Sequence, residues 1–359
     1  SITVEVLDET SGLALEGTRV RFFGEPVRFR VGPGILGRVF NGVGQVIDGG
    51  PPLAARKAYR IEGLPIKPAA RRAPSEFLET GFTAIDLMNS LVRGQKLPLF
   101  SGGGLPHDRM AVDIAINARL PSGQRQDFAI VFAGIGIPHG SAEFFREEME
   151  KSGALARTAL FLNLASDSSA QRLLTPRFAL TAAEYLAFEE GKHVLVILTD
   201  ITNYCEALRE VSASRGEIPS RKGYPGYMYS DLATLYERAG RIASLPGSVT
   251  QLPILTMPSD DISHPIPDLT GYITEGQIVL NRDLNRRDLY PPVRVLPSLS
   301  RLMKDGIGEG LTHADHPALA AQLYAAYAHA EQTRILASVV GQEGLSEVDR
   351  RYLEFGDRF

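Results

Sequence analysis

The chain has 359 residues, with 44% hydrophobic and 22% charged side chains and a formal net charge of -4. These values predict a globular protein of two or three domains, and the acidic balance argues against a general nucleic-acid surface. The longest strongly apolar run, residues 194–198, is too short to span a bilayer, so direct membrane insertion is not expected.

The amino-terminal part predicts two short strands and a long connector. Residues 2–7 and 18–22 alternate between apolar and polar side chains, which is typical of strands. Two strands alone cannot bury a face, so we expect either that further strands precede them or that this piece docks on another domain. Residues 32–68 are rich in glycine and proline and predict a turn-rich connector.

A glycine-rich loop follows an expected strand at residues 96–100 and precedes a helix-like pattern over 110–118. Its residues are Ser101, Gly102, Gly103 and Gly104. Strand, glycine loop and helix together are the layout of a phosphate-binding loop. A working loop has Lys and Ser or Thr after its last glycine, whereas this one continues with Leu105 and Pro106. We therefore expect a degenerate nucleotide site, weak or vestigial, because these two side chains offer neither charge nor hydroxyl.

The central region alternates apolar strands with amphipathic helices, which predicts a doubly wound α/β fold with a mainly parallel sheet. Further strands are expected at residues 128–133, 158–162, 193–200 and 249–257. Helices are expected at residues 142–151, from the Thr175-Pro176 pair to Gly191, and at 203–215. In the second of these helices Thr175 is the expected N-cap and Pro176 the first helical residue. After about residue 312 only helices are predicted, at 318–324 and 334–337.

The strand at residues 193–200 ends in Asp200, as a Walker B strand ends in an aspartate that supports the water shell of magnesium. An aspartate at this place also suits the N-cap of the following helix. The glycine loop, about 100 residues earlier, favours the Walker B interpretation. We expect a relict position without metal.

No glutamate stands where an ATPase of this layout places the residue that positions the attacking water. The strand at 128–133 exits through Ile137 and Pro138 instead. Four glutamates follow at spacings that suit a solvated helix face: Glu143, Glu147, Glu148 and Glu150.

Four further side chains bear on the possible chemistry. His313 and His316 are three residues apart, but two ligands do not make a site, so no metal site is expected. The single Cys205 excludes an intrachain disulfide and indicates a reducing, cytoplasmic compartment. Arg301 follows the last core strand region, and sequence physics alone leaves a surface salt bridge and a functional role both open.

Several long stretches resemble the B subunit of V-type and archaeal-type rotary ATPases, the non-catalytic partner in an alternating hexamer. They are residues 80–106, 195–215, 223–229, 260–277 and 297–303. The resemblance covers nearly the whole chain and is highly specific at 260–277. It implies a remnant of a β-barrel domain at residues 1–25, a RecA-like core at 26–312, and the start of a helical domain at 313–359.

The resemblance also implies a function. Leu105, Pro106 and the missing glutamate fit the non-catalytic subunit, so catalysis is expected from a partner A subunit in a ring of three A and three B chains. Arg301 matches the arginine finger that this subunit presents to ATP at the interface. ATP or ADP with magnesium would be held mainly by the partner. Further expected partners are central rotor and peripheral stalk subunits of a cytoplasmic head, which couples ATP hydrolysis or synthesis to proton or sodium transport.

Two other classes of function stay open. A self-sufficient NTPase, such as the motor of a secretion apparatus, would need a loop lysine and a glutamate after the second strand. A purely structural ring module would have no use for Arg301.

Overall fold

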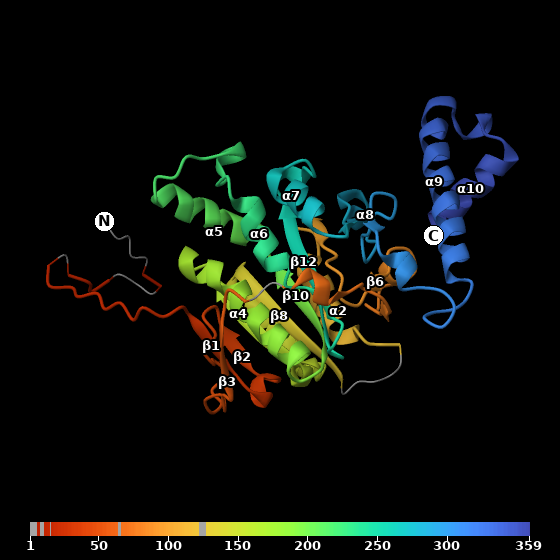
Figure 1. The fold of residues 1–359 in the computed structure, drawn as a ribbon. Coiled ribbons are helices and arrows are strands. Elements are labelled where there is room, and N and C mark those ends of the chain that lie inside the picture. The colour runs from red at the N-terminus through yellow and green to blue at the C-terminus, as the bar shows by residue number, and fades with distance from the viewer. Residues whose placement is uncertain (1–5, 8–10, 15, 64–65, 122–126) are drawn as a thin grey trace.

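The computed structural model describes residues 6–7, 11–14, 16–63, 66–121 and 127–359 (Figure 1). The strands are β1 Arg28–Val31, β2 Val39–Asn41, β3 Lys57–Arg60, β4 Arg71–Arg72, β5 Phe77–Leu78, β6 Leu91–Val92, β7 Leu99–Gly102, β8 Phe128–Ile137, β9 Thr158–Leu164, β10 His193–Thr199, β11 Gly240–Ile242, β12 Ser248–Met257, β13 Gly276–Val279 and β14 Leu299–Ser300. The α-helices are α1 Thr83–Asp86, α2 His107–Asn117, α3 His139–Lys151, α4 Ser169–Phe188, α5 Ile201–Ser214, α6 Met228–Tyr236, α7 Pro265–Ile273, α8 Arg282–Arg286, α9 His316–Val340 and α10 Glu347–Arg358.

A mainly parallel sheet forms the centre of the molecule. Its strand order is β14-β13-β7-β12-β10-β8-β9-β2, with β11 and β4 attached beside β12. Neighbours from β13 to β2 run parallel, whereas β14 and β11 pair antiparallel with β13 and β12. The predicted doubly wound α/β core with a mainly parallel sheet is confirmed.

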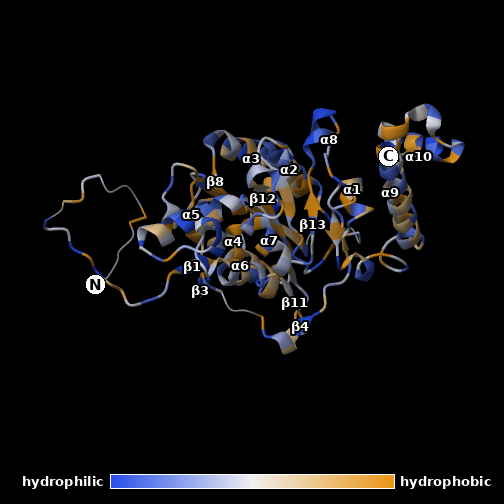
Figure 2. Cartoon of the chain, turned by 90° about the horizontal axis from the view of Figure 1, so that it is seen from above, coloured by the Kyte–Doolittle hydropathy of each residue, from blue (hydrophilic) through white to orange (hydrophobic). Residues whose placement is uncertain are grey.

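Both faces of the sheet are covered, because successive side chains of a strand point to opposite sides. In β8, Ala129 and Val131 pack in a cluster with α4, α5 and α6, while Ile130 and Phe132 pack with α2 and α3. β8 is consequently apolar and buried along its whole length, and Figure 2 shows central strands such as β12 and β13 largely in hydrophobic colours. This arrangement holds the carboxyl ends of β7, β12 and β10 in one row.

The start of α4 differs from the sequence prediction. Ser168 is the N-cap, with its hydroxyl accepting from the backbone N–H of Gln171 at 3.3 Å, and Pro176 lies inside the helix. The Thr175 hydroxyl donates to the carbonyls of Gln171 and Gly42, and both Thr175 and Pro176 are buried. Tertiary packing on the sheet therefore overrides the local preference of proline for a helix start.

The amino-terminal region differs as well. The strand expected at residues 18–22 is not formed, and this exposed segment has no β-partner among the described residues, so its backbone lacks a ladder. Most of the other expected strand, residues 2–7, lies outside the described residues. The connector at 32–68 instead contains β2, which extends the main sheet beside β9, and β3, which pairs with β1.

The carboxyl-terminal helices form a pair away from the sheet. The two helices expected at residues 318–324 and 334–337 are one continuous helix, α9, followed by α10. Figure 1 shows this pair at the end of the molecule opposite the amino-terminal segment. In the described parts of the chain, none of the helices combines the length and the apolar character that crossing a membrane requires.

Candidate functional site

The glycine loop joins the carboxyl end of β7 to the start of α2. Gly104 has a φ of +79°, in the left-handed region that glycine adopts without strain. No atom lies within 4 Å of where a Cβ would stand on Gly103 or Gly104. Leu105 is 6% exposed and packs with the core cluster under α2. The loop thus has free space around Gly103 and Gly104, while the Leu105 side chain is part of the hydrophobic core.

His107 is the first residue of α2, and the sequence analysis did not single it out. Its Nδ1 lies 2.9 Å from the Ser101 hydroxyl, and its Nε2 lies 3.7 Å from a carboxylate oxygen of Asp108. Asp108 also accepts a hydrogen bond from the Ser141 hydroxyl at 2.9 Å. Pro106 was the available signal, because a proline commonly marks the start of a helix. An imidazole tied to the loop serine therefore stands where a phosphate-binding loop opens its helix.

An ion pair lies across the glycine loop and was also missed. Arg282 binds Asp260 through two nitrogens at 2.8 and 2.9 Å, and one of them also donates to the Gly103 carbonyl at 2.9 Å. The Arg282 hydrogen bonds hold the pKa of Asp260 below its ordinary value. A Cβ on Gly102 would stand 2.1 Å from Asp260 Oδ1. Close approach of the carboxylate therefore requires glycine at position 102.

Asp200 lies at the same edge of the sheet as the loop and caps α5. Its Oδ1 accepts from the backbone N–H groups of Thr202 at 2.8 Å and Thr256 at 3.1 Å, and its Oδ2 accepts from the Thr256 hydroxyl. Thr256 is in register with Ser101, so it links the two strands that carry the expected site residues. Burial raises the pKa of Asp200 against the effect of these hydrogen bonds. Both carboxylate oxygens thus accept hydrogen bonds from the protein. This agrees with the alternative interpretation of Asp200 as the N-cap of the following helix.

Two side-chain amides, from Asn163 and Asn203, lie at the carboxyl end of β8, where an ATPase of this layout places the water-positioning glutamate. Asn163 Oδ1 accepts from the Gly136 N–H at 2.9 Å, and Asn203 Nδ2 donates to the carbonyls of Ile135 and Gly136 at 3.0 Å each. The glutamates of α3 point elsewhere, with side-chain exposures of 55%, 54%, 27% and 53% for Glu143, Glu147, Glu148 and Glu150. The predicted solvated helix face is confirmed for three of them, and Glu148 pairs with Arg109 and Lys151.

The two histidines that lie three residues apart, His313 and His316, have different partners. His316 is buried, with its ring nitrogens 3.0 Å from the Thr312 hydroxyl and 3.0 Å from the Leu87 carbonyl, while His313 lies 3.6 Å from Asp315. In the part of the chain that the structure describes, no three His, Cys, Asp or Glu side chains are placed to hold a metal ion. His316 therefore joins the carboxyl-terminal region to the end of α1.

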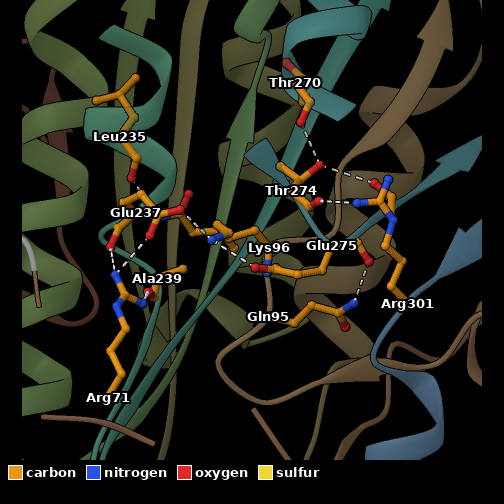
Figure 3. Close-up of polar contacts among 12 residues, drawn as sticks. Arg71, Gln95, Lys96, Leu235, Glu237, Ala239, Thr270, Thr274, Glu275 and Arg301 are labelled. Atoms are coloured by element: carbon orange, nitrogen blue, oxygen red, sulfur yellow. Dashed lines mark hydrogen bonds and ion pairs between the residues drawn. The ribbon is translucent and has the colours of Figure 1, made fainter. Parts of the chain in front are cut away.

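Arg301 directly follows β14, and its side chain is exposed. Its backbone N–H donates to the Glu275 carbonyl at 3.0 Å, and its guanidinium donates to the Thr274 carbonyl at 3.3 Å (Figure 3). Among the described residues no Asp or Glu carboxylate lies within salt-bridge distance of it. The Thr274 carbonyl therefore holds the Arg301 guanidinium and the Glu275 carbonyl holds its backbone. No described carboxylate neutralises the charge of the guanidinium.

Arg301 and the glycine loop lie at opposite ends of the sheet. The Glu275 N–H donates to the carbonyl of Lys96, which precedes β7, and Ser300 pairs with Gly276 at the start of β13. Since β13 and β7 run parallel, Arg301 stands at their amino ends, whereas the loop follows the carboxyl end of β7. The structure thus groups Ser101, Gly102, Gly103, Gly104 and Asp200 at one edge and separates Arg301 from them.

Comparison with known proteins gives family matches over most of the chain. The profile described as "ATP synthase alpha/beta family, nucleotide-binding domain" matches residues 81–300. The profile described as "C-terminal domain of V and A type ATP synthase" matches residues 305–359.

Individual relatives agree with these profiles. The V-type ATP synthase beta chain of Halothermothrix orenii is 59% identical over 356 residues, which are 99% of this chain and 77% of the relative. The V-type ATP synthase beta chain 2 of Treponema pallidum is also 59% identical over 356 residues, 99% of this chain and 74% of the relative. The solved structure of the ATP synthase subunit NeqB from Nanoarcheaum equitans superposes with a TM-score of 0.84 at 43% identity, covering 92% of this chain and 79% of that one.

Proposed function

Because the chain belongs to the ATP synthase alpha/beta family and groups there with the beta (B) chains of V-type ATP synthases, we propose that it is the non-catalytic subunit of such a complex. It alternates with a lysine-bearing A subunit in a ring of three A and three B chains. It supplies Arg301 to the ATP held by that neighbour. In the whole assembly, which includes rotor and stalk subunits, the ring couples ATP hydrolysis or synthesis to proton or sodium transport.

The glycine loop supports a non-catalytic role. His107, rather than a lysine, opens the helix after the loop, and it is tied to Ser101. Asp200 caps α5 and accepts hydrogen bonds from Thr202 and Thr256 through both carboxylate oxygens, which supports a structural role for it. At the end of β8, Asn163 and Asn203 bind main-chain groups and provide no base. Together these contacts support a nucleotide-binding fold without its own hydrolytic groups among the described residues of this edge.

The observation that carries the proposal is the position of Arg301. An exposed arginine with no carboxylate partner among the described residues, at the sheet end opposite its own glycine loop, is suited to a phosphate on another subunit. A guanidinium suits this task because its planar fork donates several charge-assisted hydrogen bonds and keeps its charge at all physiological pH values.

The chemistry follows from that placement. The partner binds Mg-ATP and positions the attacking water, while Arg301 stabilises the negative charge that spreads over the transferring phosphoryl group. Because the arginine comes from a neighbouring subunit, this stabilisation is complete only when the interface closes. Hydrolysis is thereby tied to the relative position of two subunits, as a rotary machine requires.

The proposal is tested by ATP hydrolysis of the chain alone, of the lysine-bearing subunit alone, and of the two after co-expression. We expect turnover above background only in the mixed complex, and we expect Arg301→Ala to lower it severely there, to a residual rate, without preventing assembly. Turnover by the isolated chain would favour the self-sufficient NTPase. Full turnover of the mixed complex with Arg301→Ala would favour the purely structural module.

A further inference from the structure

A chain of alternating charges, built around the buried Lys96, ends beside Arg301. Its members are Arg71, Glu237, Lys96 and Glu275 (Figure 3). The links are 3.1 Å from Arg71 to Glu237, 2.8 Å from Glu237 to Lys96 and 2.9 Å from Lys96 to Glu275. Lys96 is 6% exposed, so its ammonium group depends on the two carboxylates for the hydrogen bonds that water would otherwise provide.

Lys96 fixes Glu275 through both side chain and main chain. Besides the ion pair, the Lys96 N–H donates to Glu275 Oε2 at 2.7 Å, and the Glu275 N–H donates to the Lys96 carbonyl at 3.0 Å. Glu275 is thus held at three points by one buried residue. Its orientation is set by the core of the protein rather than by solvent.

Glu275 and its neighbour Thr274 provide the carbonyls that hold Arg301. The Glu275 carbonyl accepts from the Arg301 N–H, and the Thr274 carbonyl accepts from its guanidinium. Gln95, next to Lys96, adds a second tie, because its amide donates to the Glu275 carbonyl at 3.2 Å and to the Ser300 hydroxyl at 3.0 Å. The carbonyls that hold Arg301 are therefore themselves held by hydrogen bonds and an ion pair from the buried Gln95 and Lys96.

We propose that Lys96 is a positioning residue for Arg301. By clamping Glu275 from inside the protein, it fixes the Glu275 carbonyl that holds the Arg301 backbone and the adjacent Thr274 carbonyl that holds the guanidinium. This inference rests on the proposed function of Arg301. It assigns a role to a buried lysine, and it expects the loss of Lys96 to act through Arg301 alone.

The test is a double-mutant cycle in the mixed complex, with kcat, KM and melting temperature measured for Lys96→Met, Arg301→Ala and the double variant. Misplacing a group by about 1 Å can cost about a hundredfold in rate. We expect Lys96→Met to lower kcat by at least about tenfold with little change in KM, since the partner holds the nucleotide. The double variant should be no slower than Arg301→Ala, and Lys96→Arg should restore most of the rate.

Lys57→Met is the matched control, because it also removes a lysine from an ion pair. Lys57 lies on β3, and its ion pair with Glu189 is exposed. It should leave kcat unchanged. If Lys96→Met does not assemble, Glu275→Gln replaces it in the same cycle, since the amide keeps the shape and weakens the clamp.

Unchanged kcat in the clamp variant would overturn the inference. So would an equal further loss on the Arg301→Ala background, which would show a general structural effect. In either case a strong effect of Arg301→Ala alone would leave the proposed function standing. If Arg301→Ala itself has no effect, both proposals fail.

Discussion

The charged residues of this chain fall into two kinds. Many of the described ones are paired, as Asp260 with Arg282 or Lys96 with Glu275, and in the second pair the carboxylate lowers the cost of burying the lysine. Arg301 is of the other kind, because its guanidinium and its backbone N–H each donate to a carbonyl and it has no counter-charge among the described residues. A guanidinium kept in this state is available for an anion from outside the chain, which is the basis of its proposed role.

Asp200 gives a prediction about stability. Asp200→Ala removes the cap of α5 and leaves the N–H of Thr202 without its acceptor, while the Thr256 N–H keeps the Thr202 hydroxyl at 3.0 Å, so it should lower the free energy of unfolding by about 1–2 kcal/mol. Asp200→Asn keeps an oxygen acceptor and should cost less. Burial raises the carboxyl pKa in the folded state, so the wild type loses stability as pH rises above the ordinary range of Asp.

Denaturant unfolding of the three proteins between about pH 4 and pH 7 measures both effects. The difference between Asp200→Asn and wild type should move in favour of the variant as pH rises. A difference that stays constant over this range, or moves the other way, would show that the buried carboxylate is not costly in its charged form.

At the scale of elements, the strands were predictable because burial on both faces makes them continuously apolar, as in β8 and β10. The start of α4 was not, because Pro176 is accommodated by packing that lies outside the local sequence. β2 was missed because its three residues join the sheet only through the distant strand β9.

The same distinction holds for the candidate site. The glycine loop and Asp200 carry local patterns, and the structure places both at one edge of the sheet. Arg282 and Asp260 are 22 residues apart in sequence and meet only across the folded loop. The link from Lys96 to Arg301 is likewise a product of strand register. No local sequence pattern predicts this link.

The glycine loop should bind nucleotide weakly and hydrolyse none. A charge-assisted hydrogen bond is worth about 1.5–3 kcal/mol, so the missing lysine alone should cost roughly ten- to a hundredfold in affinity. The open glycines at the start of α2 can still hold an anion loosely. Calorimetry of the isolated chain with Mg-ATP measures this, and submicromolar binding accompanied by turnover would contradict the account.

Two neighbouring glycines of this loop should respond differently to alanine. In Gly102→Ala the new Cβ would stand 2.1 Å from Asp260 Oδ1, so the partly exposed Asp260–Arg282 pair must move, at a cost of up to about 1 kcal/mol in stability. Gly103→Ala is the matched control, because its Cβ would meet no atom within 4 Å. Equal melting temperatures for the two variants would show that the ion pair across the loop is not fixed.

At the scale of the molecule, the two ends of the sheet carry different residues. One end carries the glycine loop, which has no lysine, and the other carries Arg301, so a single chain cannot bring the two together. Such a polarity suits a ring, in which each interface joins one end of a subunit to the loop of the next. This is the arrangement proposed for the alternating A and B chains.

The chain should therefore assemble with a lysine-bearing subunit rather than form a functional ring of its own. A ring of identical copies would contain an arginine at every interface and no competent loop to receive it. Native mass spectrometry after co-expression reads the composition directly. The appearance of only separate species, with no mixed complex, would count against this assembly.

The central claim is that Arg301 acts in trans on the partner's ATP, and steady-state hydrolysis by mixed complexes with Arg301 or Arg301→Lys tests it most directly. The charge survives this change, so a surface salt bridge would lose less than about 1 kcal/mol. An arginine finger is worth about 10³–10⁵ in rate, and lysine lacks its planar fork. At equal stoichiometry and melting temperature, the account predicts a severe loss of kcat, whereas rates within about a factor of three would make Arg301 a structural arginine and contradict it.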